Sequence, residues 1–123
     1  MKIRVGFVSN SSSSSFVIYG TSFETSELIE LLVKNKVIKK SREQLEKFIE
    51  DGEEGELISE AFEKSDIESF FDYENSTVYI GNSPFEIKDN ETGKEFKERT
   101  EQAIEKMIGK RVELYRICET IYN

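Results

Sequence analysis

The apolar residues of this chain change their spacing several times, and this change restricts the fold more than any other feature. In four segments they recur three and four residues apart, as Leu28, Leu31 and Leu32 do, which is the spacing of an amphipathic helix. We expect those helices over residues 24–35, 41–52, 57–62 and 92–109. Five other segments are short and rich in β-branched and aromatic residues, as strands are; they cover residues 3–8, 16–20, 70–73, 77–80 and 111–117, with a helix as the alternative for the last. The sequence therefore predicts an α+β fold, with a small, mostly antiparallel sheet of about five strands and three to four helices on one face.

Residues with capping preferences mark the ends of two of these helices. Ser41 stands three residues before Gln44, and Thr92 stands three residues before Glu95, which is the pattern of a capping box at a helix N-terminus. Gly109 follows the last apolar residue of the helix that begins near Thr92, so we expect it to end that helix.

Two local expectations concern the middle of the chain. The helix after Ser41 is expected to bury Leu45, Phe48 and Ile49. The strands 70–73 and 77–80 form a hairpin, in which Asn75 suits the positive φ that a tight turn requires.

Length and composition indicate one domain that spans residues 1–123. The chain is 37% hydrophobic, and neither an internal repeat nor a linker divides it. No apolar stretch approaches the ~18–20 residues of a membrane span, and the first residues lack the apolar core of a signal peptide. Cys118 is the only cysteine, so no internal disulfide forms. We therefore expect a protein of the reducing cytoplasm, with no membrane partner.

The chain contains no histidine, which removes Ser–His and Cys–His nucleophile pairs and the common zinc sites. Asp89, Glu91 and Glu95 could supply oxygen ligands for Mg²⁺ or Ca²⁺, but acids at a helix start also complete a capping box and complement the helix dipole, and we favour that interpretation. Cys118 is expected to be a small core residue. We predict no catalytic residue, metal site or cofactor, and the sequence favours a binding protein over an enzyme.

The negative charge is concentrated in the middle of the chain. The net charge is -8, yet residues 43–74 hold thirteen acids against two lysines, and residues 34–42 hold five cations and no acid. An acidic segment of this kind suits a partner with a positively charged face, and the alternative is that it serves only solubility. The overall acidity argues against a nucleic-acid binder. The residues that we expect to contact a partner are Glu50, Asp51, Glu53, Glu54, Glu56 and Glu60.

A run of small polar residues separates the first two expected strands. It consists of Ser9, Asn10, Ser11, Ser12, Ser13, Ser14 and Ser15. The simplest interpretation is a solvated connection. Because the two strands would hold its ends, its backbone N–H groups and hydroxyls could also bind an anion, with Arg4 as a nearby positive charge. Docking of a partner, or modification of the serines, is a third interpretation.

Two patches of the sequence resemble a known group of proteins. Arg4-x-Gly6-Phe7-Val8 with the serine run and Phe16 is similar to the N-terminal signature of many small uncharacterised proteins of tailed phages and prophages. The second patch is Val78-Tyr79-Ile80-Gly81-x-Ser83-Pro84, followed by Asp89-x-Glu91-Thr92 and Glu95-Phe96-Lys97, and it resembles a downstream region of the same proteins. Asn90 stands where that group has a second Asp. The resemblance implies a phage gene expressed in the cytoplasm of a bacterial host, and it implies no activity.

Two functions remain open at this point. The first is a non-enzymatic phage accessory protein that binds a host protein, for host takeover or against host defence, through its acidic middle. The alternative is a protein that binds a phosphate-bearing small ligand or nucleotide through the serine run and sequesters or cleaves it. The sequence does not indicate the oligomeric state.

Overall fold

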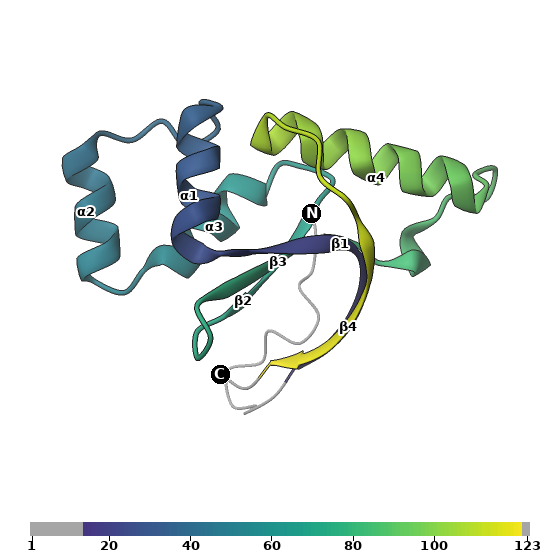
Figure 1. Ribbon diagram of the computed structural model, residues 1–123, viewed down its shortest axis with the longest axis horizontal. Coiled ribbons are helices and arrows are strands. Elements are labelled where there is room, and N and C mark those ends of the chain that lie inside the picture. Colours follow the sequence, from purple (N-terminus) through teal and green to yellow (C-terminus); the bar gives the residue numbers. More distant parts are fainter. Residues whose placement is uncertain (1–13, 122–123) are drawn as a thin grey trace.

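A computed structural model shows the fold and describes residues 14–121 (Figure 1). It contains four strands and four α-helices with one short 3₁₀ helix, so the α+β fold is confirmed for the described part of the chain. Their bounds, in chain order, are β1 Ser14–Glu24, α1 Thr25–Lys34, α2 Arg42–Glu50, α3 Glu54–Phe62, β2 Glu68–Asp72, β3 Thr77–Asn82, η1 Pro84–Glu86, α4 Gly93–Ile108 and β4 Tyr115–Ile121.

The described strands form one antiparallel sheet in the order β2-β3-β1-β4. β1 is central and long, because it pairs with β4 over residues 14–20 and with β3 over residues 19–24. The sheet therefore has four described strands where the sequence predicts about five. The remaining predicted strand, residues 3–8, lies outside the described residues.

The helices lie on one side of the curved sheet (Figure 1). The core cluster contains Phe23, Val78 and Ile80 from the sheet, and these alternate residues point to the same face of neighbouring strands. Leu28 and Leu32 of α1, Leu57, Ile58 and Phe62 of α3, and Ile104 and Ile108 of α4 complete this core, and all are buried. α2 has no buried residue and packs against α3, so it is the peripheral helix.

The predicted helix caps are confirmed. Ser41 and Gln44 form a reciprocal capping box at the start of α2, and Thr92 and Glu95 form another at the start of α4. Gly109 ends α4 in the left-handed conformation with φ of 77°. Each cap satisfies backbone groups that the helix leaves unpaired, which explains why these helices begin and end where the sequence indicates.

The β2–β3 turn differs from the prediction in one residue. Positive φ occurs at Ser76, with a value of 49°, and not at Asn75. The buried Asp72 carboxylate accepts hydrogen bonds from the Asn75 backbone N–H at 3.3 Å and from Asn75 Nδ2 at 2.8 Å. Because both bonds hold Asn75 in place, the left-handed residue is the next one.

Two strand boundaries also differ from the prediction. β1 begins two residues earlier than predicted and continues to Glu24. The last strand is β4, Tyr115–Ile121, and not residues 111–117. The residues just before it connect the end of α4 to the sheet edge, and Leu114 among them is buried in the core cluster. In the part of the chain that the structure describes, none of the helices combines the length and the apolar character that crossing a membrane requires.

Candidate functional site

The six acids predicted to contact a partner lie at the junction of α2 and α3. Glu50 is the last residue of α2 and Asp51 its C-cap, whereas Glu53 is the N-cap of α3. Glu54, Glu56 and Glu60 belong to α3 itself. We call these six residues together the acidic α2–α3 surface. The structure therefore brings the predicted residues together on one helical hairpin.

A tight turn fixes the geometry of this hairpin. Gly52 has a φ of 69°, and its N–H donates to the carbonyl of Ile49 at 3.1 Å. The N–H of Glu53 donates to the carbonyl of Phe48 at 2.8 Å. These two bonds are those of a Schellman motif, which satisfies the last carbonyls of α2 and reverses the chain. A glycine is suited to this position because the left-handed conformation costs it little.

The carboxylates at the turn are close enough to affect each other. The pKa of Glu53 is raised, first by a hydrogen bond with the Glu56 carboxyl group, then by burial, and then by the charges of Glu56 and Asp51. The part of this rise that comes from the charges of Glu56 and Asp51 reflects repulsion between the carboxylates in the free protein. A positively charged partner would relieve that repulsion.

The acids before the turn and those after it lie at opposite ends of a helix dipole. Glu54 and Glu56 lie in the first turn of α3, where the helix dipole favours negative charge. Glu50 and Asp51 lie at the C-terminal end of α2, where the dipole disfavours it. Glu50 and Asp51 therefore add nothing to helix stability at this place.

An apolar side chain adjoins the acids. Ile49 is 51% exposed, although the sequence predicts that it is buried, so that prediction is wrong. Leu45 and Phe48 are half-buried against the core, as the helical spacing requires, and they occupy the inward face of α2. Since Ile49 follows Phe48 directly, it lies at the margin of that face, and no neighbouring element covers it fully. A single exposed apolar residue is ordinary on a protein surface, but at this position it would add apolar contact to an interface that the acids form.

The hairpin is anchored to the sheet through α3. Gly55 is buried at the start of α3, and a Cβ at this position would stand 2.8 Å from the ring of Phe71 and 2.8 Å from the hydroxyl of Tyr73. Those two rings meet edge to face with centroids 4.2 Å apart. This close packing of α3 on the β2–β3 hairpin gives the acidic α2–α3 surface a rigid base.

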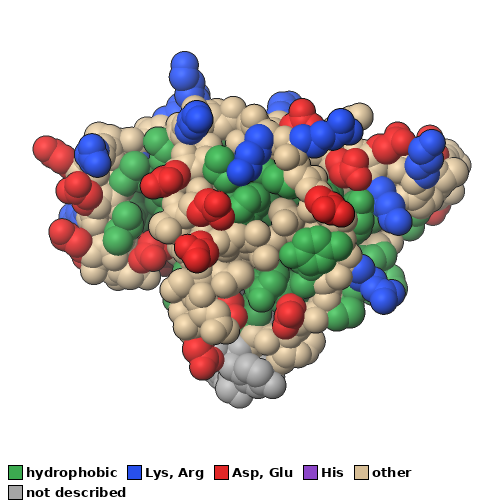
Figure 2. All heavy atoms as spheres, in the orientation of Figure 1, with side chains coloured by type: hydrophobic (Ala, Val, Ile, Leu, Met, Phe, Trp, Pro, Cys, Tyr) green, Lys and Arg blue, Asp and Glu red, His purple; other side chains and the backbone are tan. Residues whose placement is uncertain are grey.

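Positive charges gather at the other end of α2. The five cations of residues 34–42 precede it or begin it, and Lys40 Nζ lies 5.2 Å from the ring centre of Phe48. Figure 2 shows acids at the α2 edge of the molecule and Lys or Arg side chains along the adjoining border. α2 therefore lies between the basic residues 34–42 and the acidic turn that follows it, in agreement with the uneven charge of the sequence, although the helix itself carries Glu43 in its first turn and Lys47 in its last.

The candidate anion loop falls mostly outside the described residues. Arg4, Ser9, Asn10, Ser11, Ser12 and Ser13 are not described. Ser14 and Ser15 belong to β1, and the Ser15 hydroxyl shares a hydrogen bond of 3.0 Å with the Thr120 hydroxyl of β4. Binding of a phosphate-bearing ligand by this loop stays a prediction.

The acids near the start of α4 have structural roles. Arg99 donates from Nε to Glu91 Oε2 at 2.8 Å and from Nη2 to Glu91 Oε1 at 2.9 Å. The Arg99 guanidinium thereby lowers the pKa of Glu91 to about 2. Glu95 Oε1 accepts the N–H of Thr92 in the capping box at 2.9 Å. The capping interpretation is therefore confirmed for Glu95, whereas Glu91 forms an ion pair with Arg99.

Cys118 lies on the surface of β4, so the prediction that it is a core residue is wrong. Its β4 neighbours Ile117 and Ile121 are buried, and the alternation of the strand directs Cys118 to the other side. Among residues 14–121, the structure contains no group of three or more Cys, Asp and Glu side chains that could hold a metal ion.

No family model, curated protein or solved structure matches this chain.

Proposed function

We propose that this protein is a non-enzymatic accessory protein of phage origin that binds a protein of its bacterial host through the acidic α2–α3 surface. The observation that carries the proposal is the combination of crowded carboxylates at the α2–α3 turn with the exposed Ile49 of the peripheral helix α2. The phage origin rests on the sequence resemblance. The place of action that follows is the host cytoplasm, where the protein would act in host takeover or against host defence.

The partner that fits this surface is a protein with a basic face. Attraction between a negative patch and a positive one accelerates association and selects among partners, and it weakens as salt is added. Ile49 would supply apolar contact in such an interface, since its side chain is already half exposed. A nucleic-acid-binding channel of a host protein has the required charge.

Charge reversal at two exposed positions tests the proposal. Glu50→Lys combined with Glu60→Lys changes the net charge from -8 to -4 without touching the first turn of α3. Glu98→Lys combined with Glu105→Lys makes the same change on the exposed face of α4 and serves as the matched control. We expect the tagged protein and its α4 control to retain a host protein from lysate at low salt, and the α2–α3 variant to lose it. Equal retention by all three proteins would contradict the proposal.

A further inference from the structure

A small pocket lies where the starts of α1 and α3 meet the β2–β3 turn. Its volume is about 340 Å³, at the lower end of the ~300–1,000 Å³ that is usual for ligand sites. It adjoins the acidic α2–α3 surface, because Glu54 belongs to both. All of its described lining residues are polar, and they are Glu24, Thr25, Ser26, Glu54, Asn75 and Ser76.

One polar group of these lining residues has no partner. Thr25 is the first residue of α1 and is only 4% exposed. Its backbone N–H donates to the carbonyl of Ser76 at 2.9 Å, which ties the start of α1 to the β2–β3 turn. Its hydroxyl oxygen is buried and makes no hydrogen bond in the structure. Because a buried polar group without a partner costs free energy, an occupant that hydrogen-bonds to this hydroxyl gains affinity from it.

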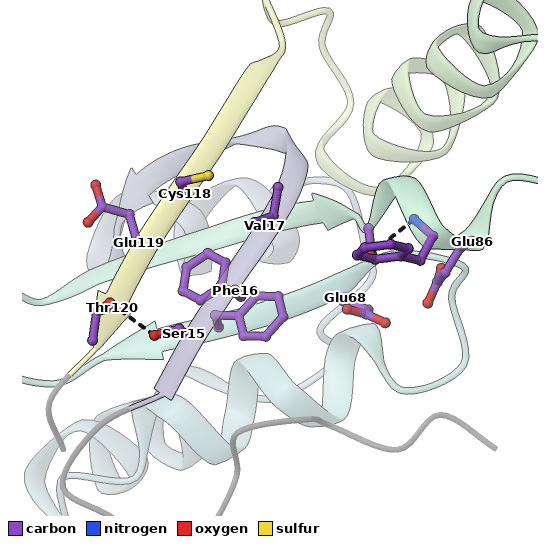
Figure 3. A pocket seen from close by; sticks show the side chains of 11 residues that line it. Ser15, Phe16, Val17, Glu68, Glu86, Cys118, Glu119 and Thr120 are labelled. Carbon is purple, nitrogen blue, oxygen red and sulfur yellow. Dashed lines mark hydrogen bonds between the residues drawn. The ribbon is translucent and has the colours of Figure 1, made fainter.

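A larger pocket of about 860 Å³, beside β1 and β4, differs in this respect (Figure 3). The hydroxyls of Ser15 and Thr120 in its wall share a hydrogen bond of 3.0 Å (Figure 3). The hydroxyl of Ser83 accepts the N–H of Phe85 at 3.2 Å. The residues before Ser14 lie outside the described part of the chain, so we assign no occupant to this larger pocket.

The other groups around the small pocket are chiefly hydrogen-bond acceptors. Glu24 is the N-cap of α1, but its exposed side chain makes no capping hydrogen bond. Asn75 uses its backbone N–H and Nδ2 to bond the Asp72 carboxylate, which leaves its Oδ1 as an acceptor. With the carboxylate of Glu54, these groups suit an occupant that is rich in N–H donors.

The charge of the small pocket corresponds to about one anion. The N-termini of α1 and α3 meet there, and each is equivalent to roughly half a positive charge. The carboxylates of Glu24 and Glu54 outweigh this charge, and none of the described lining residues is Lys or Arg. The two carboxylates would repel an anion from the helix N-termini, whereas one positive charge would balance the pocket.

We propose that this pocket receives the side chain of one arginine of the partner protein. A guanidinium group is always charged and carries five N–H donors in a planar fork, so it can donate to the carboxylates and to the Thr25 hydroxyl together. A lysine ammonium group is a compact and strongly hydrated charge, which suits several separate acceptors less well. The inference rests on the proposed function, since it names the residue type by which the partner of the acidic α2–α3 surface is anchored.

The first test uses the purified full chain and three small probes. They are N-acetyl-arginine amide, N-acetyl-lysine amide and N-acetyl-citrulline amide, in which a neutral urea replaces the guanidinium group. We expect the arginine probe to bind roughly tenfold more tightly than the citrulline probe and about threefold more tightly than the lysine probe in NMR titrations. It should shift the amide signals of residues 24–26, 54, 75 and 76. Equal binding of the arginine probe and either other probe, or shifts confined to other residues, would overturn the proposal.

Variants of the lining residues complete the test. Glu54→Gln should weaken binding of the arginine probe by about fivefold or more, because it removes a charge and keeps the size of the side chain. Glu27→Gln is the matched control, since Glu27 also lies in the first turn of a helix but does not line the pocket, and it should change binding less than twofold. Equal effects of Glu54→Gln and Glu27→Gln would contradict the assignment of this pocket.

The Thr25 hydroxyl has a test of its own. Thr25→Val should weaken binding of the arginine probe by about threefold and leave the melting temperature unchanged or higher, because the hydroxyl contributes no hydrogen bond to the fold. A lower melting temperature would show that the hydroxyl is bonded within the protein, and this would overturn the proposal.

The pocket and the acidic α2–α3 surface can fail separately. If the arginine probe does not bind but the host protein is still retained and lost on Glu50→Lys with Glu60→Lys, the arginine pocket is wrong and the proposed function stands. If the arginine probe binds at the pocket while that double variant retains the host protein as before, the proposed function is wrong. If both proposals hold, Glu54→Gln also weakens retention of the host protein, and Glu27→Gln does not.

Discussion

The pair of glycines at the β1–β3 junction allows the two central strands to approach closely. Gly20 and Gly81 are direct partners in the register. A Cβ on Gly20 would overlap the carbonyl oxygen of Ile80 and stand 2.8 Å from the Cα of Gly81. Both obstacles are backbone atoms, which cannot rotate away as a side-chain tip can. A Gly20→Ala substitution must therefore push β1 and β3 apart.

The cost of this substitution follows from the overlap. Forcing one carbon into closely packed surroundings destabilises a protein by about 1–3 kcal/mol. For a domain of this size, 1 kcal/mol corresponds to a change in melting temperature of about 4 °C. We therefore expect Gly20→Ala to lower the melting temperature by about 4–12 °C, measured by circular dichroism and supported by urea unfolding.

A second glycine provides the control. Gly93 begins α4, and a Cβ there meets no atom within 4 Å. Gly93→Ala should leave stability unchanged or raise it by up to about 1 kcal/mol, because alanine has less freedom in the unfolded chain. If Gly20→Ala melts within about 1 °C of the unchanged protein, the register that places Gly20 against Gly81 is wrong.

Two further substitutions test contacts between elements. Asn35 Nδ2 donates to the carbonyls of Lys106 at 2.7 Å and Met107 at 3.0 Å, so it joins the end of α1 to the last turn of α4. Asn35→Ala should lower the free energy of unfolding by about 1–2 kcal/mol in urea unfolding, and no loss would show that solvent replaces both bonds. Because Arg99 lowers the pKa of Glu91 from its ordinary value of 4.5 to about 2, the Glu91 carboxylate stabilises the fold above pH 4.5, and this contribution is lost as the pH falls toward 2. Glu91→Gln should therefore melt below the unchanged protein at pH 6, with a gap that narrows between pH 4.5 and pH 2; a gap that is constant with pH would contradict this assignment.

The features that the sequence predicts correctly depend on neighbours along the chain. The capping boxes at Ser41 and Thr92 and the αL glycine at position 109 join residues a few positions apart, so their geometry follows from local chemistry. The acidic α2–α3 surface was predictable for the same reason, since its six residues lie within eleven positions of the chain.

The features that the sequence misses depend on distant contacts. Ile49 has the apolar character and helical spacing of a core residue, and only the peripheral position of α2 leaves it exposed. Cys118 is exposed because it alternates with the buried Ile117 of β4, and only the packing of the sheet decides which face of that strand meets the core. Among residues 14–121, β4 pairs with β1 as far as Ser14, whereas the pairing of β3 with β1 stops at Tyr19. No local sequence pattern shows how far β1 pairs with β3 and how far it pairs with β4. Phe85 is exposed as well, and its sequence position was unusual: it is a large apolar residue that directly follows Pro84 and lies outside every predicted element.

The salt dependence of partner binding tests the central claim most directly. The affinity of the full chain for the host protein that it retains would be measured over a series of salt concentrations, alongside the variant with Glu50→Lys and Glu60→Lys. We predict that the affinity of the unchanged protein falls steadily as salt rises, and that the variant binds more weakly with a shallower dependence on salt. An affinity that is independent of salt, or two proteins with the same affinity and slope, would contradict a function based on the acidic α2–α3 surface.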